Sequence, residues 1–518
     1  MLLAELVKTH AAVAATRSRL RKRELLAEAL RSAAERDDVP TEQRGTEIEV
    51  VASYLSGRAR QRRTGVGYRS LSDPPPAART PSLTPVEVDE ALEALSHLQG
   101  PGSQAARAGA LSDLYSRATP DEQRFLTGLV LGELRQGALD SLLLDAIATA
   151  ADVPLKAVRR AAMFSALSGP IARAALTDGT EALESFRLQV GRPVRPMLAS
   201  SAPDVGAALE KFEGAAVAAD TKLDGIRIQL HKDGDDVAVF TRSLDDVTER
   251  LPEVVALARS LAIESAVLDG EAIALDETGR PRAFQETAAR TGSHDAESHQ
   301  GRTPLSVYFF DVLHLDGTDL LDAPAADRLA ALDSAAPPSA VVPRLVSADP
   351  DAVQAFFDDT VSGGHEGLVL KSLDAPYDAG RRGGAWVKVK PRHTLDLVVL
   401  AVERGSGRRQ GWLSNIHLGA RDPATGELVM LGKTFKGMTD QMLAWQTERF
   451  TELADGPTDG YVVRVRPEQV VEIAFDGVQR SPRYPGGVAL RFARVVRYRD
   501  DKTADEADTL DTVRSLRT

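Results

Sequence analysis

The feature that most limits the possible folds is a change of residue pattern at the proline-rich segment 191–196 (Gly-Arg-Pro-Val-Arg-Pro). Before it, alanine, leucine, glutamate and arginine dominate, and apolar residues recur at spacings of three and four, the period of an amphipathic helix. After it, short apolar or alternating runs lie between glycine and aspartate turns, which is typical of strands. Since 518 residues suffice for about three domains, we interpret this change as a domain boundary.

The part before the boundary is predicted to be helical over 1–70 and 86–185, with the proline-rich stretch 73–85 as a linker or surface loop. Its clearest helix start is 119–122 (Thr-Pro-Asp-Glu), where threonine caps the helix and proline takes the first helical position. Gly137 is expected to close this helix. The apolar stripe between these points is core and comprises Phe125, Leu126, Leu129, Val130 and Leu134.

The part after the boundary is predicted to be an α+β region followed by a β-rich region. Runs that fit strands are 237–240, 266–275, 305–312, 368–371 and 385–389, and 251–263 fits a helix. We expect a largely antiparallel sheet here. After Pro391, a region about the size of a small barrel opens with the run 395–402 and has glycine-rich turns at 404–411 and 422–426.

Composition excludes several classes of protein. Hydrophobic content of 43% and charged content of 27% are typical of globular proteins. No apolar run is long enough to span a membrane, and the N-terminus lacks the apolar core of a signal peptide. Without cysteine there are no disulfides, thiolate zinc sites or cysteine nucleophiles. A cytoplasmic location is the default expectation.

The distribution of charge favours an anionic polymer as partner, although the net charge of −12 argues against one. Binding depends on local patches rather than on the sum. Basic residues gather at 17–23, at 58–69 and at 480–499, while acidic residues gather elsewhere, for example at 500–511. Any one cluster could be a solvated helix face, but three of them indicate nucleic acid.

The stretch 220–227 (Asp-Thr-Lys-Leu-Asp-Gly-Ile-Arg) places Lys222 between an apolar run and an alternating run. Such a lysine is expected at a turn or strand end in a pocket walled by sheet, where desolvation would lower its pKa and leave a nucleophilic amine. Asp224 would steer the amine or a metal, and Gly225 would let a bulky ligand approach the backbone. Taken alone, the stretch fits a surface lysine beside a turn better.

Charged residues in later strand-like runs support the pocket interpretation. Arg242 follows one run, Glu271 and Glu366 lie in runs that otherwise look buried, and Lys388 and Lys390 share one face of a strand. Each alone fits an edge-strand charge or a hairpin ion pair. Because buried charges cost solvation unless they meet a partner, together they suit a triphosphate with Mg²⁺.

The order of these segments resembles the nucleotidyltransferase motifs of ATP-dependent DNA ligases. The segments are K-L-D-G-I-R, T-R-S, L-D-G-E, Y-F-F-D-V, E-G-L-V-L-K and W-V-K-V-K-P. The ending 490–502 resembles the last family motif, and 62–67 and 133–137 resemble the helical DNA-binding domain of larger ligases. The resemblance therefore covers nearly the whole chain and is closest to the three-domain type of archaea, eukaryotes and some bacteria. It implies an all-α DNA-binding domain at 1–190, an α+β adenylation domain at 191–391 and an all-β OB-fold domain at 392–518.

The resemblance also implies roles for individual residues. Lys222 would carry AMP, and Glu271 and Glu366 would bind metal. Nucleotide contacts would come from Asp220, Arg227, Arg242, Glu271, Phe310, Arg382, Lys388 and Lys390. DNA contacts would come from Arg63, Arg135, Arg491, Arg494 and Arg497. The family more often has glutamate at the position of Asp220, and the sequence leaves open whether Phe309 or Phe310 faces the adenine.

The implied function is ATP-dependent ligation of nicked duplex DNA by a monomer that encircles it, with Mg²⁺ or Mn²⁺ and without a membrane partner. The C-terminal barrel would swing about a hinge at 386–395. Alternatives are an RNA ligase or GTP-using capping enzyme, an NAD-dependent ligase and a non-catalytic DNA-binding scaffold. The helical front region argues against an RNA ligase or capping enzyme. The lack of cysteine argues against an NAD-dependent ligase, and the intact lysines and carboxylates argue against a non-catalytic scaffold. The sequence leaves open a role in replication, repair or recombination, the preferred metal and any protein partner.

Overall fold

The computed structural model describes residues 1–518 except 36–38, 62–63, 135–139, 293–303, 381 and 517–518. The described residues before the first strand form helices around one apolar core. The helices are α1 (Leu3–Ala15), α2 (Arg19–Ala34), α3 (Thr41–Leu55), α4 (Pro85–His97), α5 (Ser103–Ser116), α6 (Pro120–Val130), α7 (Asp140–Ala151), α8 (Leu155–Met163), α9 (Gly169–Thr177) and α10 (Gly179–Glu184). The predicted helical character of this part is confirmed. None of the described helices is long and apolar enough to cross a membrane.

Helix α6 begins as predicted but ends earlier. Thr119 and Glu122 form a reciprocal capping box, and proline takes the first helical turn. At the other end Gly132 adopts a positive φ of 67°. Its N–H bonds to the carbonyl of Leu129, and the next N–H bonds to that of Gly128, which closes a Schellman motif. The predicted closure at Gly137 is therefore wrong, and Gly137 itself lies outside the described residues.

The central region consists of two five-stranded sheets. One has the order β1-β10-β9-β2-β8 and the other β4-β3-β5-β6-β7. The strands are β1 (Leu198–Ser201), β2 (Val217–Lys222), β3 (Ile226–Asp233), β4 (Asp236–Thr241), β5 (Ser265–Ala274), β6 (Leu305–Leu315), β7 (Thr318–Asp319), β8 (Arg344–Ser347), β9 (Gly367–Ser372) and β10 (Arg382–Val389). Every pairing is antiparallel except that of β1 with β10, which confirms a largely antiparallel arrangement.

Helices surround these sheets, and the chain crosses between the sheets at one decisive point. The helices are α11 (Val205–Leu209), α12 (Pro252–Ser260), α13 (Phe284–Gly292), α14 (Ala325–Ala335) and α15 (Pro350–Ser362). Strand β2 ends at Lys222 in the first sheet, and β3 begins at Ile226 in the second. Lys222 therefore lies at the seam between the two sheets.

The C-terminal region is an antiparallel sheet with a separate apolar core. Its strands are β11 (His393–Arg404), β12 (Leu413–Arg421), β13 (Leu428–Thr434), β14 (Val462–Arg464), β15 (Val470–Phe475) and β18 (Arg494–Arg499), with the hairpin β16 (Gly477–Arg480) and β17 (Val488–Arg491) beside them. The region also contains α16 (Asp440–Glu452) and α17 (Leu510–Ser515), so it is β-rich rather than purely β.

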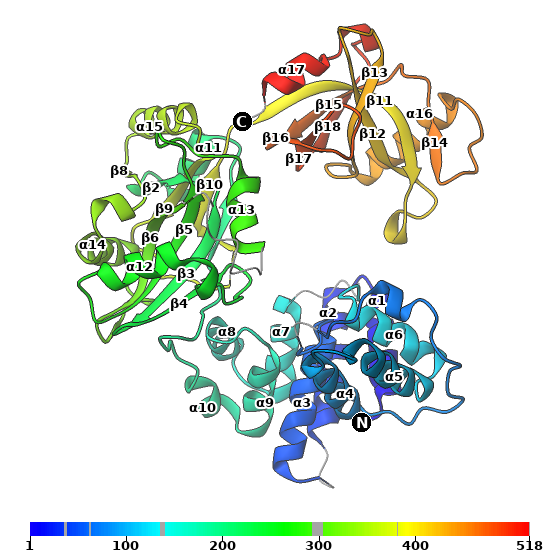
Figure 1. Ribbon diagram of the computed structural model, residues 1–518, viewed down its shortest axis with the longest axis vertical. Coiled ribbons are helices and arrows are strands. Elements are labelled where there is room, and N and C mark those ends of the chain that lie inside the picture. Colours follow the sequence, from blue (N-terminus) through cyan, green and yellow to red (C-terminus); the bar gives the residue numbers. More distant parts are fainter. Residues whose placement is uncertain (36–38, 62–63, 135–139, 293–303, 381, 517–518) are drawn as a thin grey trace.

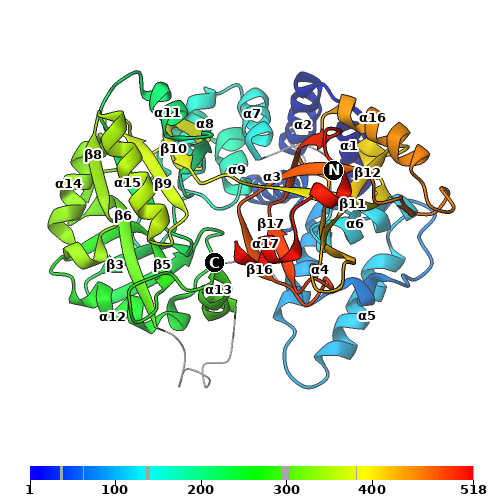
Figure 2. The same cartoon turned by 90° about the horizontal axis from the view of Figure 1, so that it is seen from above.

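The central region holds its two neighbours by different kinds of contact. Met163 and Phe164 of the helical region share a buried apolar cluster with Trp386, and Arg160 forms a bidentate pair with Asp322 at 2.7 and 2.6 Å. The C-terminal region is held by ion pairs that are described in the next subsection. Both outer regions extend from the same side of the central region (Figures 1 and 2).

Candidate active site

A pocket of about 840 Å³ lies at the seam between the two central sheets and is closed on one side by the C-terminal region. It brings together nine of the residues singled out from the sequence: Asp220, Lys222, Arg227, Arg242, Glu271, Phe310, Lys388, Lys390 and Arg491. These residues come from six strands, the loop after β4 and the position that follows β10, so the folded chain gathers them from across some 270 positions of sequence. Such a convergence of polar groups on a partly apolar cavity is typical of a ligand site.

Lys222 is held by carboxylates at the end of β2. Its Nζ lies 2.5 Å from Glu366 Oε2, and the other oxygen of Glu366 accepts from Lys390 Nζ at 2.7 Å. Burial lowers the pKa of Lys222, but the charges of Glu366, Glu271 and Asp224 outweigh burial and raise the pKa above its usual value. The predicted fall in the pKa is therefore wrong, because the sequence did not show that three carboxylates surround the amine.

The two glutamates beside Lys222 differ in the direction in which their pKa is shifted. Burial raises the pKa of Glu271 to about 7, since Lys222 and Arg227 offset only part of the cost of burying the carboxylate. Burial acts in the same direction on Glu366, but Lys222 and Lys390 reverse it and hold the pKa of Glu366 below its usual value. Near neutral pH, Glu366 is thus a fixed anion and Glu271 can gain or lose a proton.

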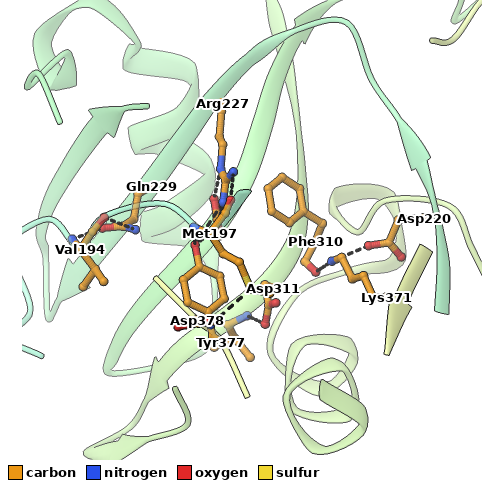
Figure 3. Close-up of polar contacts among 12 residues, drawn as sticks. Val194, Met197, Asp220, Arg227, Gln229, Phe310, Asp311, Lys371, Tyr377 and Asp378 are labelled. Atoms are coloured by element: carbon orange, nitrogen blue, oxygen red, sulfur yellow. Dashed lines mark hydrogen bonds and ion pairs between the residues drawn. The ribbon is translucent and has the colours of Figure 1, made fainter. Parts of the chain in front are cut away.

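Arg227 lines the pocket but spends most of its hydrogen bonds on the protein. Its guanidinium donates to both oxygens of Asp269 at 3.0 and 2.5 Å, to the carbonyl of Met197 at 2.6 Å and to the hydroxyl of Tyr377 at 3.1 Å (Figure 3). Of the five N–H groups of an arginine, these contacts within the described residues leave one for a ligand. Tyr377 and Asp269 were not singled out from the sequence, because their role depends on this long-range contact.

The far wall of the pocket contains an ion-pair cluster that sequence reasoning also missed. The carboxylate of Asp220 lies 2.6 Å from Arg344 Nε and 2.6 Å from Lys371 Nζ. Lys371 ends the segment E-G-L-V-L-K, and a lysine in an otherwise apolar strand was a signal that could have found it.

Phe310 lines the pocket edge-on to Trp386 at 6.0 Å between ring centroids. Its neighbour Phe309 is fully buried in the core on the opposite face. Of the two rings, that of Phe310 therefore faces the pocket.

Gly225 lines the pocket and also packs closely against β5. A Cβ added here would lie 2.5 Å from the carbonyl oxygen of Ala272 and 2.8 Å from Cγ of Glu271. The position therefore requires a glycine for room beside β5, and its role in the approach of a ligand stays a prediction.

Replacing Gly225 with alanine is expected to slow the reaction in this pocket by about a hundredfold, because an ångström of displacement at Lys222 or Glu271 spoils the reacting geometry. Gly384→Ala is the control, since its added Cβ would meet no described atom within 4 Å. The rate of that reaction is measured for both variants. Equal rates for Gly225→Ala and the unmodified chain would contradict the prediction.

The structure describes only some of the other residues that were predicted from the sequence to contact nucleotide or DNA. Arg242 is exposed at the rim of the pocket. Arg63 and Arg135 lie outside the described residues, as does the side chain of Arg382. Lys388 and Lys390 line both the pocket and an adjoining cleft of about 550 Å³.

The three arginines of the C-terminal region have three different environments. Arg491 donates to Asp224 at 2.7 and 3.4 Å and lies over the ring of Phe284. Arg494 is exposed in the adjoining cleft. Arg497 is exposed and pairs with Glu472 at 2.7 Å. With the 3.4 Å contact between Lys390 and Asp476, the Arg491 pair fastens the C-terminal region over the pocket.

Glu271, which lines the pocket, and Glu366, which lies beside Lys222, offer two carboxylates to a divalent metal. Within the described residues no group of three or more histidine, aspartate or glutamate side chains could hold a metal by itself. Mg²⁺ is commonly bound by one or two carboxylates together with substrate phosphates and water. The donor set therefore fits Mg²⁺ in the presence of a nucleotide, not as a metal held by protein alone.

Lysines, arginines and acidic residues around a seam of two largely antiparallel sheets are suited to binding a phosphate-bearing ligand. The sequence models of three family regions match the chain: "DNA ligase N terminus" at 59–148, "ATP dependent DNA ligase domain" at 196–390 and "ATP dependent DNA ligase C terminal region" at 409–502. The chain belongs to the ATP-dependent DNA ligase family and is a DNA ligase of that class. This assignment removes the capping-enzyme and NAD-dependent alternatives.

Individual relatives agree with this assignment over their full lengths. A probable DNA ligase of Beutenbergia cavernae is 61% identical and covers 100% of this chain and 99% of its own. A probable DNA ligase of a Nocardioides species is 60% identical with the same coverage. Among solved structures, one titled "Pmar-Lig_PreS3" has a TM-score of 0.60 at 18% identity and covers 95% of this chain and 99% of its own, which supports the fold.

Proposed function

We propose that this ligase seals nicks in duplex DNA through a covalent lysine–AMP intermediate on Lys222. Nζ of Lys222 attacks the α-phosphorus of ATP, a P–N bond forms, and the bond to pyrophosphate breaks. AMP then passes to the 5′-phosphate at the nick, and the 3′-hydroxyl displaces it to form the phosphodiester. The observation that carries the proposal is Lys222 itself, a mostly buried lysine that lines the pocket beside Glu366 and Lys390.

The neighbouring carboxylates determine the protonation state of Lys222 before the reaction. Glu366 stabilises the ammonium form of Lys222, so Lys222 must lose a proton before it attacks. Mg²⁺, held by Glu271, Glu366 and the phosphates, would supply positive charge that offsets charge on the leaving pyrophosphate. A Glu366 carboxylate engaged in this way would attract the ammonium less and so favour loss of the proton from Lys222. Lys388 and Lys390 would bind the phosphates from the facing strand.

We further propose that the chain has three domains, with boundaries at 1–190, 191–391 and 392–518, and that the last is an OB fold. The helical domain and the C-terminal domain extend from the same side of the central one (Figure 1), so a monomer could enclose a duplex between them. Arg494 and Arg497 would contact its phosphates, and the Arg491–Asp224 pair would hold the C-terminal domain in the closed position. Lys390–Arg392, between β10 and β11, would be the hinge.

A gel assay with labelled nicked substrates tests this function. We expect sealing of nicked duplex DNA with ATP and Mg²⁺ or Mn²⁺, a lysine-linked AMP that forms without DNA, and little activity with GTP or NAD. The same nick built from RNA strands is the control for substrate class. Preferential sealing of RNA, or sealing without any protein-bound AMP, would overturn the proposal.

A further inference from the structure

A buried lysine, Lys371, joins the two central sheets at the wall of the pocket. It lies on β9 and is only 1% exposed. Its Nζ donates to the carbonyl of Phe310 on β6, in the other sheet, at 2.6 Å and lies 2.6 Å from Oδ2 of Asp220 on β2 (Figure 3). The catalytic steps proposed above do not use this lysine. Because burying an ammonium costs several kcal/mol of solvation, its contacts require an explanation.

The same ammonium lies over two aromatic rings of the pocket. Nζ of Lys371 is 4.9 Å from the ring centroid of Phe310 and 4.6 Å from that of Trp386. Both rings line the pocket, as do Asp220 and Lys371. A cation at these distances is attracted by the ring faces, so Lys371 restrains the place where a flat base would stack. It thus contacts one acidic and two aromatic parts of a single wall.

Asp220 is the polar group of this wall that can distinguish one base from another. Arg344 holds one oxygen of its carboxylate and Lys371 the other, each at 2.6 Å. A carboxylate has about four lone-pair positions and only accepts hydrogen bonds, so positions remain for a donor. The 6-amino group of adenine is such a donor. The 6-oxo group of guanine is an acceptor, and two acceptors face to face repel.

We propose that Lys371 is a positioning residue that sets the nucleobase selectivity of this ligase. It fixes the Asp220 carboxylate as an acceptor for a 6-aminopurine, and it fixes Phe310 as the surface on which that purine stacks. Lys371 forms no bond to the reacting phosphorus. The inference rests on the proposed function, since it requires that the nucleotide binds in this pocket with its base against Asp220 and Phe310.

The test uses the full-length variant Lys371→Met, which keeps the length of the side chain and leaves Asp220 paired with Arg344. Rates of transfer to the lysine, of AMP from ATP and of GMP from GTP, are measured over a range of concentrations of each nucleotide. We expect the KM for ATP to rise at least about tenfold with little change in kcat, and the preference for ATP over GTP in kcat/KM to fall at least about tenfold, the effect of one mispaired buried hydrogen bond. A purely structural lysine would not change the preference.

Lys232→Met is the matched control. Lys232 is also a buried lysine, 5% exposed, and donates to the carbonyls of Gly234 and Ile263 at 2.8 and 2.6 Å, away from the pocket. It should lower thermal stability in a similar way without changing the ratio of ATP to GTP. If Lys371→Met is folded and keeps the original KM and ratio, or if Lys232→Met changes the ratio equally, the proposal is wrong.

A second variant keeps the proposal testable if Lys371→Met does not fold. Asp220→Asn retains the shape but offers an amide that can donate to a 6-oxo group, so labelling by GTP should rise relative to labelling by ATP. An unchanged ratio in this variant would also overturn the proposal. Failure of the proposed function looks different, because the unmodified chain would then form no adduct on Lys222, neither AMP from ATP nor GMP from GTP.

Discussion

Replacing Lys222 with alanine is expected to abolish labelling of the protein by α-labelled ATP, a loss of at least about a thousandfold. The attacking atom is removed, and effects of this size follow the loss of a nucleophile. Sealing of a nick that already carries a 5′-adenylate should persist in this variant, because that step needs no lysine nucleophile. The persisting step shows that the variant is folded and binds DNA.

Two further variants define what Lys222 contributes. Lys222→Arg keeps a cation beside Glu366, 2.5 Å from the present amine, but an arginine does not deprotonate and cannot attack. It should therefore be as inactive in labelling as alanine. Lys211→Ala removes an exposed lysine of the same region that bonds only to the carbonyl of Ser201 among the described residues, and should label normally. Labelling of Lys222→Ala above background would show that another residue carries AMP.

Replacing Arg328 with methionine is expected to destabilise the central region by about 3–5 kcal/mol. The side chains of Arg328 and Asp311 are both 0% exposed and share two hydrogen bonds, at 2.7 and 3.1 Å. Arg328 also donates to the carbonyls of Ala323 and Ala375. Removing Arg328 leaves the buried carboxylate of Asp311 without a compensating charge. The resulting loss of stability is far larger than the difference in stability between the intact ion pair and two apolar residues in its place.

Unfolding in urea, followed by a probe in the central region, measures this effect. Arg466→Met is the control, because its pair with Glu468 is half exposed on both sides and should be worth less than about 1 kcal/mol. The double variant Arg328→Met with Asp311→Leu should recover much of the loss, since no unpaired charge remains. A loss below 1 kcal/mol in the single variant would show that the carboxylate finds another partner.

Local patterns predicted the elements well where a single physical signal dominates. The period-two and apolar runs gave strands that differ from β4, β5, β6 and β9 mostly at their ends, because side-chain alternation is a local property of a strand. The start of α6 was readable for the same reason, since a capping box lies within four residues. Its end was not, because the stripe continues in sequence past Gly132, where the backbone actually turns.

The sequence by itself determined the identity and order of the reactive groups: one lysine at a strand end, two carboxylates in buried-looking runs and a pair of lysines at the end of another strand. The chemistry of those residue types, and the order of motifs, pointed to adenylate transfer. Only the tertiary structure decided how charge is balanced among them. It surrounds Lys222 with carboxylates that raise its pKa, turns Phe310 rather than Phe309 towards the pocket, and brings Arg491 to Asp224 across 267 positions.

The physical reason is the range of the interactions. Hydrogen bonding within a helix turn or along a strand is encoded by neighbours in the chain, whereas an electrostatic environment depends on every charge within a few ångströms, wherever it lies in the sequence. Lys371 shows both sides: its place in an apolar strand was visible in the sequence, but its contact with Asp220 and Phe310 exists only because three strands of two sheets meet at one wall.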